Sequence, residues 1–505
     1  MLDDLDRIGP VLVLAAVAAL IIVWGFLPAV RPLPAARGRA LVLFALLGPA
    51  GAALWALSLL ARDVAGFAFA DSVVLDDFSL FFYFLFAAVA AAVILASESY
   101  ARRFGEYEPE YYALLLFATA SMLLLATSRD LILIFVALEL TSISQYILAA
   151  LRKDDRSTEA GVKYLLLGAV ASAVILYGMT FLFGLTGTTR LVAPAGEPSI
   201  ASVIAERGDA MGEGLILAVV FLIGGLGFKM AVIPFQMWAP DVYEGAPAPV
   251  AAFLSVASKA AAFAVVMRIF FEGLPDATVR GDWSDVFAVV AALSMTFGNL
   301  LALVQTDIKR LLGYSSIAQA GYFMVGLAAV GGAGGLGLGA SGVLFFIAAY
   351  AFTNLAAFIV VIAVADRGGS SAIDAYAGLA RRAPLLAAAL ALALVSLTGL
   401  PPTAGFVAKL YIFDAAVDSD LVWLVVVAVL NSVVSAFYYL RVAGIMFLRE
   451  PASDERIATA AGLKLALAVA AAGVLAAGLL PSPLLDAARD AAAVFGDSPG
   501  NAASR

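Results

Sequence analysis

The sequence contains no cysteine and no histidine. Without cysteine, the chain can form neither disulfides nor thiolate-held iron–sulfur clusters. Without histidine, it lacks the usual haem and zinc ligand and the side chain that most often carries protons near neutral pH. We therefore expect no metal and no cofactor site in this chain. Any proton chemistry must use glutamate, aspartate, lysine, tyrosine and water.

Charged residues are also scarce, at 13% of the 505 residues, whereas 63% are hydrophobic. A soluble domain is about 25% charged. The composition therefore predicts an integral membrane protein that is surrounded by a lipid bilayer. Basic residues form no patch outside the short loops, so no nucleic-acid partner is expected.

Long apolar runs fill most of the chain, and each has the roughly 20 residues that a helix needs to cross a bilayer. The runs do not alternate between polar and apolar residues, as barrel strands do. The predicted class is therefore an all-α polytopic membrane protein with about 14 transmembrane helices. The runs lie near 9–29, 40–61, 78–97, 110–127, 130–150, 161–184, 215–238, 248–271, 285–304, 311–330, 341–365, 384–412, 421–447 and 462–481.

Basic residues gather in every second loop between these runs, for example at Arg102 and Arg103 and at Lys309 and Arg310. The alternate loops are rich in aspartate and glutamate. Short cytoplasmic loops carry the excess of lysine and arginine in membrane proteins. This asymmetry predicts that both termini lie on the outer, periplasmic side.

A short motif indicates an internal repeat. Residues 141–145 read TSISQ and residues 315–319 read SSIAQ, which is an offset of 174. The same offset relates spans four to eight to spans nine to thirteen. A repeat of five helices is odd-numbered, so the second copy must be inverted. The expected division is an N-terminal three-helix segment (1–105), a first repeat (110–273), an inverted repeat (284–448) and a C-terminal helix with a tail (449–505).

Two repeat-related spans contain helix breakers, namely Pro234 in the seventh span and Pro401 and Pro402 in the twelfth. A proline frees a backbone carbonyl that, at membrane depth, only protein or water can satisfy. We therefore expect helices 7 and 12 to be discontinuous, with a wet cavity at each break.

Four ionisable residues lie inside the predicted spans: Glu139, Lys229, Lys259 and Lys409. A charge near the bilayer centre costs roughly 2.5–3.5 kcal/mol, so such residues are functional candidates. Glu139 and Lys229 are natural counter-charges, because pairing offsets part of the desolvation cost. These residues predict a proton relay; the alternative interpretation is that they only hold helices together.

Two further cations lie nearer to the ends of spans. Lys163, close to the cytoplasmic end of the sixth span, is either a proton entrance or an anchor whose long side chain reaches the interface. Arg268, near the outer end of the eighth span, is expected to be such an anchor.

The stretch 229–259 resembles a known family. It begins Lys-Met-Ala-Val-Ile-Pro-Phe-Gln-Met-Trp, continues with Pro-Asp-Val-Tyr-Glu-Gly-Ala-Pro at 240–247, and ends at Lys259. This pattern is similar to the antiporter-like membrane subunits of bacterial respiratory complex I, the NADH-quinone oxidoreductase, and to subunit N in particular. The lysine at position 409, where the M-type subunit carries glutamate, and the short tail after Pro481 also favour subunit N.

The resemblance implies roles for individual residues. Glu139 would pair with Lys229, Lys259 would be the central relay lysine, and Lys409 would pass the proton toward the outer side. Lys163 matches a further family lysine. The chain departs from the family at Gln236, where many subunit N sequences have histidine.

The resemblance also implies a function. The chain would be a proton-translocating subunit in the membrane arm of an inner-membrane NADH:quinone oxidoreductase, and so part of an enzyme without holding a redox centre itself. NADH, FMN, Fe–S clusters and quinone would belong to partner subunits, and M-type and K-type subunits would be its neighbours. The alternatives are an Mrp-type cation/proton antiporter and a non-pumping membrane scaffold.

Overall fold

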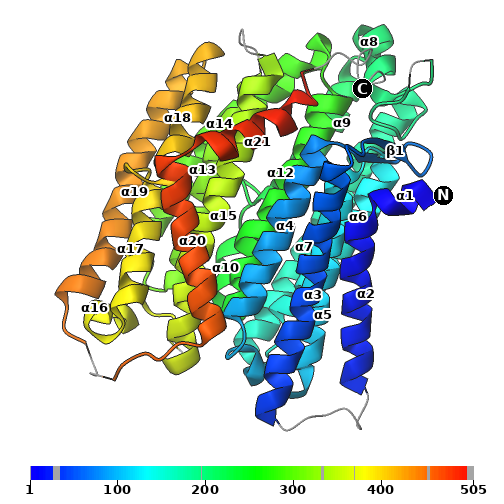
Figure 1. Ribbon diagram of the computed structural model, residues 1–505. Coiled ribbons are helices and arrows are strands. Elements are labelled where there is room, and N and C mark those ends of the chain that lie inside the picture. Colours follow the sequence, from blue (N-terminus) through cyan, green and yellow to red (C-terminus); the bar gives the residue numbers. More distant parts are fainter. Residues whose placement is uncertain are drawn as a thin grey trace.

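The computed structural model describes residues 2–26, 34–194, 196–330, 335–368, 370–451 and 455–496. Nearly all of this part of the chain is helical (Figure 1). The strands described within it are β1 (Gly66–Ala68) and β2 (Val73–Leu75), which form one short antiparallel pair at the end of the bundle where the chain begins.

Twelve helices of the described chain are long and apolar enough to cross a membrane, which confirms the all-α membrane class. They are α2 (Gly9–Phe26), α3 (Pro34–Ala61), α4 (Asp77–Ala96), α5 (Glu108–Thr127), α6 (Leu131–Ala149), α7 (Asp155–Thr186), α9 (Glu213–Met230), the continuous helix Ala248–Gly273, α13 (Ala277–Leu303), α15 (Gly335–Gly368), α19 (Val422–Leu448) and α20 (Ala461–Leu479).

The two other predicted spans correspond to less regular elements. One is α14 (Ile308–Ala328), which carries two cations in its first turn. The other is the pair α17 (Pro384–Thr398) and α18 (Ala404–Asp418), each too short to cross a bilayer alone. The expected number of fourteen is therefore reached only when α14 and the α17–α18 pair are each counted as a crossing.

Short helices connect the long ones, and the hydrophobic pattern did not predict them because they are brief or amphipathic. One of them, α21, lies across the end of the bundle and packs against α4 and α15 (Figure 1). The short helices are α1 (Leu2–Arg7), η2 (Ala101–Tyr107), α8 (Ile200–Met211), α10 (Trp238–Gly245), η5 (Ile373–Tyr376), α16 (Leu379–Arg382) and α21 (Ser482–Ala493).

Aspartate side chains begin several of the long helices. Asp76, Asp154 and Asp276 cap α4, α7 and α13 by accepting hydrogen bonds from backbone N–H groups of the first turn. Asp130 and Asp307 do the same for α6 and α14. Such a cap satisfies donors that the helix itself leaves unpaired. Five of the few acidic residues in this chain therefore define where helices start.

The caps of α6 and α14 also show the inverted repeat. Asp130 accepts a hydrogen bond from the Thr189 hydroxyl, and Leu131 N–H donates to the Thr189 carbonyl at 2.9 Å. Asp307 accepts from the Ser371 hydroxyl in the same way, and the next backbone N–H donates to the Ser371 carbonyl at 2.8 Å. The chain crosses the bundle through α6, α7, α9–α10, Ala248–Gly273 and α13 between these motifs, so the two equivalent motifs lie at opposite ends.

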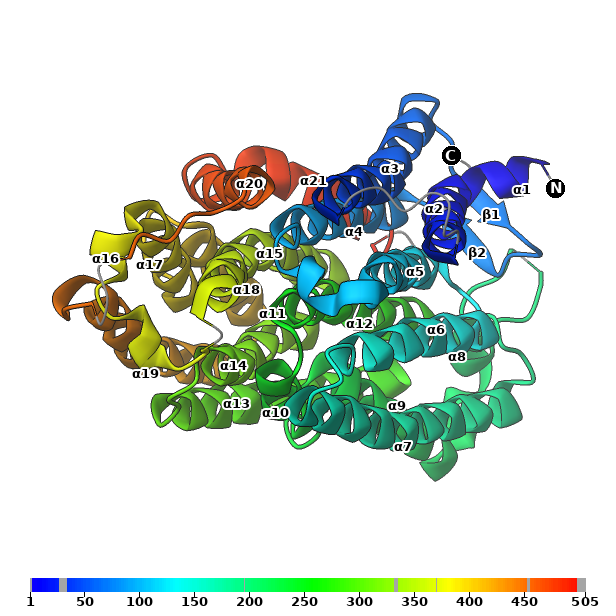
Figure 2. The same ribbon diagram turned by 90° about the horizontal axis from the view of Figure 1, so that it is seen from below.

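The view along the helices shows how the repeats are arranged (Figure 2). Helices α6, α7 and α9 gather on one side, and α13, α14, α18 and α19 gather on the other. The segment that contains α11 (Ala248–Phe253) and α12 (Lys259–Met267) lies between them. The central helix therefore contacts both halves of the molecule.

Both predicted helix breaks are present. Helix α9 ends at Met230, where Ala231 adopts a left-handed conformation, and Pro234 lies in the segment that leads to α10. The stretch 240–247 lies mostly within α10. Helix α17 ends at Thr398, and Pro401 and Pro402 lie between it and α18. Helices 7 and 12 of the predicted order are therefore discontinuous.

The helix Ala248–Gly273 contains an irregularity that the sequence did not indicate. After α11 it forms a π-helical turn, η3 (Leu254–Ser258), and after α12 a second one, η4 (Arg268–Gly273). A π-turn places one extra residue in a helix and changes the direction of the side chains that follow. Lys259 and Arg268 each stand at a junction between α12 and such a turn.

Candidate functional site

Lys229 lies in the last turn of α9, one residue before the helix ends. Lys229 therefore lies near a helix end and not in the middle of a helix, because α9 stops before Pro234. Lys229 is only 9% exposed, and its Nζ donates to the Ser142 Oγ of α6 at 2.6 Å. The rings of Tyr146 and Phe228 lie 5.9 and 5.7 Å from Nζ.

Glu139, the expected partner of Lys229, is half-buried on α6 and accepts a hydrogen bond from the Ser172 hydroxyl of α7. Among the ion pairs of the described residues, none joins Glu139 to Lys229. In this structure each group contacts a serine hydroxyl in place of the other. The two groups are still neighbours, since Ser142 lies about one helical turn from Glu139.

Lys259 is the first residue of α12, directly after the turn η3. It is 2% exposed, and its Nζ donates to the backbone carbonyl of Ser316 in α14 at 2.5 Å. The Ser316 Oγ lies 3.4 Å from the Tyr243 hydroxyl of α10. Lys259 therefore joins the central helix to the second repeat.

Lys409 lies on α18, beyond the break, and is 4% exposed. Its Nζ donates to the Thr398 carbonyl at 2.9 Å, to the Leu397 carbonyl at 3.4 Å and to the Ser432 hydroxyl at 3.0 Å. The two carbonyls belong to the end of α17. A helix C-terminus carries partial negative charge and unpaired carbonyls, so it favours a cation.

Gly399 makes this contact possible. It has a φ of +88°, which side chains other than glycine rarely tolerate, and a Cβ there would lie 2.7 Å from the Lys409 Cδ. The break in helix 12 thus creates the binding place of the Lys409 ammonium group.

Lys229, Lys259 and Lys409 share one property. In the described part of the chain, none of them has a carboxylate within ion-pair distance; their ammonium groups contact hydroxyl and carbonyl oxygens. A buried charge held only by neutral groups is costly, and its proton can leave without a carboxylate being left unpaired. The arrangement is therefore suited to giving and receiving protons.

Lys163 lies at the edge of a polar pocket of about 220 Å³. Its side chain is 42% exposed and pairs with Asp241 at 2.9 Å and with Glu159 at 2.8 Å. Asp241 also pairs with Arg310 at 2.6 Å, so the pocket joins α7, α10 and α14. Partial burial alone would raise the pKa of Asp241, but the hydrogen bonds from Lys163 and Arg310 outweigh it and hold that pKa below its usual value.

Gln236, where the family often has histidine, lies in the break after α9. Its Oε1 is buried and has no hydrogen-bond partner among the described residues. An amide cannot titrate, so this position offers a hydrogen-bonding group and no proton store.

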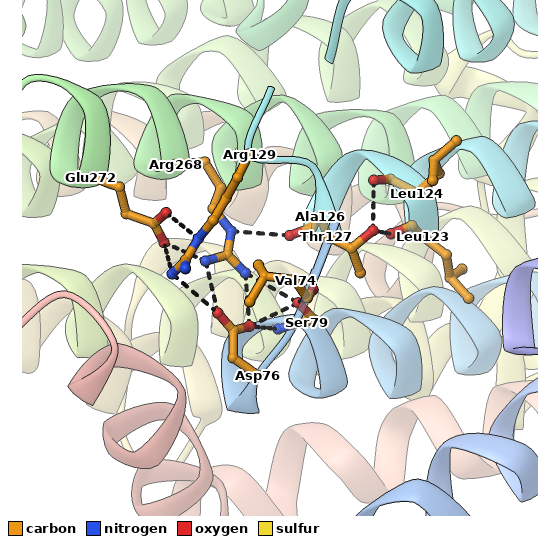
Figure 3. A network of polar contacts seen from close by, with 10 residues as sticks. All are labelled: Val74, Asp76, Ser79, Leu123, Leu124, Ala126, Thr127, Arg129, Arg268 and Glu272. Carbon is orange, nitrogen blue, oxygen red and sulfur yellow. Dashed lines mark hydrogen bonds and ion pairs between the residues drawn. The ribbon is translucent and has the colours of Figure 1, made fainter. Parts of the chain in front are cut away.

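A second buried charge cluster was not predicted, and Arg268 is at its centre (Figure 3). Arg268 is fully buried, donates to both Asp76 carboxylate oxygens at 2.9 and 2.7 Å, and pairs with Glu272 one turn along its helix. Arg129 pairs with Glu272 at 2.6 Å and lies 3.6 Å from Asp76. The expectation that Arg268 is an interfacial anchor is therefore wrong.

The cluster holds the N-terminal helices to the central helix, since Asp76 caps α4 while Arg268 and Glu272 belong to η4. Burial alone would raise the pKa of Asp76, but the adjacent Arg268 and Arg129 lower it to about 2. Of the contacts in this cluster, only the pair of Arg268 and Glu272 could be predicted from the sequence, because the two residues are four apart on a helix. The contact with Asp76 depends on how distant segments pack.

Taken with the inverted repeats and the broken helices, these buried lysines define a multi-pass membrane protein of the antiporter-like class. Residues 128–435 match the protein family described as NADH:quinone oxidoreductase/Mrp antiporter, transmembrane. Two curated relatives are each 44% identical to this chain and are named NADH-quinone oxidoreductase subunit N. The one from Dehalococcoides mccartyi aligns over 83% of this chain and 86% of its own length. The one from Trichlorobacter lovleyi aligns over 84% and 85%.

Solved structures give the same result. A chain in the structure of respiratory complex I from Thermus thermophilus with bound aureothin is 34% identical, has a TM-score of 0.75, and is matched over 94% of this chain and 98% of its own. A chain of the Mrp complex from Dietzia sp. DQ12-45-1b has a TM-score of 0.85 at 21% identity, over 98% of both chains, and shows the shared fold alone. The chain belongs to the NADH:quinone oxidoreductase/Mrp antiporter family, among its subunit N members.

Proposed function

We propose that this chain is a proton-translocating subunit in the membrane arm of a bacterial NADH:quinone oxidoreductase. The observation that carries the proposal is that Lys229, Lys259 and Lys409 are buried, are each held by neutral oxygens, and are spread over both repeats. The names of the relatives support the choice of complex.

In the proposed mechanism, a proton enters at the pocket beside Lys163 and reaches Lys229. It then passes to Lys259 and to Lys409, and it leaves on the outer side. Each transfer turns one ammonium into a neutral amine and the next amine into an ammonium, through hydroxyl groups and water. Glu139 controls the first step, because moving Lys229 from the Ser142 hydroxyl to the carboxylate would hold its proton more firmly.

The chain would lie in the inner membrane with both termini on the periplasmic side. In this orientation the pocket of Lys163 and Arg310 faces the cytoplasm, in agreement with the basic loops on that side. The divisions at 1–105, 110–273, 284–448 and 449–505 would correspond to the accessory helices, the two half-channels and the C-terminal helix with its tail.

As a subunit of an oxidoreductase, the chain would take part in the enzyme's reaction without holding a redox centre. NADH, FMN, Fe–S clusters and quinone would bind to partner subunits, and neighbouring M-type and K-type membrane subunits would transmit the coupling. Conformational changes in those neighbours would open and close the contact between Glu139 and Lys229.

The test is to replace Lys229 by alanine and Glu139 by glutamine in the assembled complex and to count protons moved per NADH oxidised. We expect both variants to lower this ratio. Lys464, an exposed lysine on α20, provides the matched control, and Lys464→Ala should leave the ratio unchanged. Full pumping by both variants would show that the relay assignment is wrong.

An Mrp-type cation/proton antiporter is the second candidate, because the matching family includes Mrp antiporter chains as well as NADH:quinone oxidoreductase chains. Purification from the native membrane separates the two, since flavin and Fe–S subunits accompany the chain only in complex I. A non-pumping scaffold would tolerate substitution of Lys259 and Lys409 without losing proton transport.

A further inference from the structure

The repeated motif that first showed the internal repeat carries a serine and a glutamine three residues apart. Ser142 and Gln145 lie on α6, and Ser316 and Gln319 lie at the equivalent positions on α14, 174 residues later. Residues three apart on a helix lie on the same face, one above the other. Each helix therefore presents one serine and one glutamine along a single line.

The pair on α6 lies between Lys229 and Lys259. Ser142 Oγ accepts the hydrogen bond from Lys229. Gln145 Oε1 accepts from the Tyr164 hydroxyl at 2.9 Å and from the Ser258 Oγ at 3.0 Å. Ser258 is the last residue of the turn η3 and directly precedes Lys259. The polar face of α6 thus joins the surroundings of two successive lysines.

The pair on α14 lies between Lys259 and Lys409, although here the serine contacts its lysine through the backbone. The Ser316 carbonyl accepts the hydrogen bond from Lys259. Gln319 Nε2 donates to the Leu397 carbonyl at 3.0 Å, and this carbonyl also accepts from Lys409 at 3.4 Å. In both repeats the serine contacts one lysine and the glutamine reaches the surroundings of the next.

Gln145 has an unused donor at this place. Its side chain is 1% exposed, and its Nε2 has no hydrogen-bond partner among the described residues. The hydroxyl of the adjacent Tyr146, whose ring lies 5.9 Å from Lys229 Nζ, is likewise buried without a partner in the described chain. Buried polar groups are nearly always hydrogen-bonded, to protein or to ordered water. These atoms therefore mark a place for water between Lys229 and Lys259.

We propose that Gln145 and Gln319 are positioning residues of the proton path: Gln145 orders the hydrogen-bonded link from Lys229 to Lys259, and Gln319 orders the link from Lys259 to Lys409. The inference rests on the proposed function. An amide neither stores nor releases a proton at physiological pH, so each glutamine orients water and hydroxyl groups while the lysines carry the charge. The inverted repeat supplies one such link to each half of the path.

The experiment replaces each glutamine by methionine, which has a similar length and volume but makes no comparable hydrogen bonds. In the assembled complex, we expect Gln145→Met and Gln319→Met each to slow proton transfer through this chain by about fivefold, the effect of one lost hydrogen bond on a rate. The protons moved per NADH oxidised should fall accordingly. The Gln305 side chain is half-buried and bonds only to the Leu301 carbonyl of its own helix, so Gln305→Met is the control that keeps the normal ratio.

A purely structural role is distinguished by Gln145→Glu, which keeps the shape and a hydrogen-bonding head group. We expect it to restore at least half of the proton yield that methionine removes. Normal yield in both methionine variants, or equal yields for Gln145→Met and Gln145→Glu, would overturn the inference. Failure of the proposed function is seen separately, because Lys229→Ala would then also pump normally.

Discussion

Replacing Arg268 by methionine removes the central cation of the buried cluster in Figure 3. Arg268 contacts two carboxylates, Asp76 and Glu272. The side chains of Arg268 and Glu272 are buried, and that of Asp76 is 14% exposed. The variant leaves both carboxylates to share Arg129, which lies 3.6 Å from one and 2.6 Å from the other. The cluster would change from two cations and two anions to one cation and two anions.

Removing one partner of a buried ion pair costs about 3–5 kcal/mol, because the remaining charge is left uncompensated. Arg129 still compensates part of the negative charge of the two carboxylates. We therefore expect a loss near the lower end of this range, about 3 kcal/mol in the free energy of unfolding. Asp76→Asn in the same chain removes the surplus negative charge. The double variant should therefore be more stable than Arg268→Met alone.

The effect should also depend on pH. In the native cluster the pKa of Asp76 is about 2, because Arg268 and Arg129 outweigh the effect of burial. A carboxylate with a lowered pKa contributes stability above its ordinary pKa near 4, and this contribution is lost as the pH falls through about 2. Without Arg268 the opposing effect of burial dominates and raises that pKa. The difference between variant and wild type should then shrink between pH 7 and pH 5.

The assay is denaturant titration of the full chain in detergent, followed by tryptophan fluorescence. Trp283 is a suitable probe, since it is fully buried against Phe270 and Phe271 at the same end of the central helix. Arg449→Met, which removes an exposed pair with Asp374, is the control and should have little effect. A loss below about 1 kcal/mol for Arg268→Met would refute the reasoning, because the cluster would then behave as a surface pair.

Two predictions concern the lysines themselves. Gly399→Ala places a methyl group against the side chain of Lys409 at a positive φ, so proton yield should fall sharply; Gly444→Ala, with open space around it, should have no effect on the yield. Ser142→Ala removes the oxygen that holds Lys229, so we expect proton transfer to slow by about fivefold and the proton yield to fall in the same assay. Unchanged yields would show that these contacts do not govern transfer.

The sequence by itself determined the class, the repeat and the charged residues. Apolar runs of sufficient length leave a chain no alternative to membrane helices, because unpaired backbone groups are intolerable in lipid. The offset of 174 between residues 141–145 and 315–319 can be read from the sequence alone. The equivalent caps of α6 and α14, at Asp130 and Asp307, show the same repeat at an offset of 177. Lys229, Lys259 and Lys409 stood out because charge inside apolar runs is costly.

The tertiary structure decided which atoms hold those charges. A proline predicts that a helix is interrupted, but it does not fix where the hydrogen bonding stops, and α9 ends four residues before Pro234. Ser142, the Ser316 carbonyl and the end of α17 became lysine partners through packing between segments far apart in the chain.

Arg268 illustrates the same limit most clearly. Its spacing from Glu272 is local and can be read from the sequence, whereas its contact with Asp76 joins residues 192 positions apart. No periodicity encodes such a contact, because it depends on how α4 packs against the central helix and on the π-turn that directs the arginine side chain. For this reason the sequence identified the charges of this membrane protein, and only the fold determined their partners.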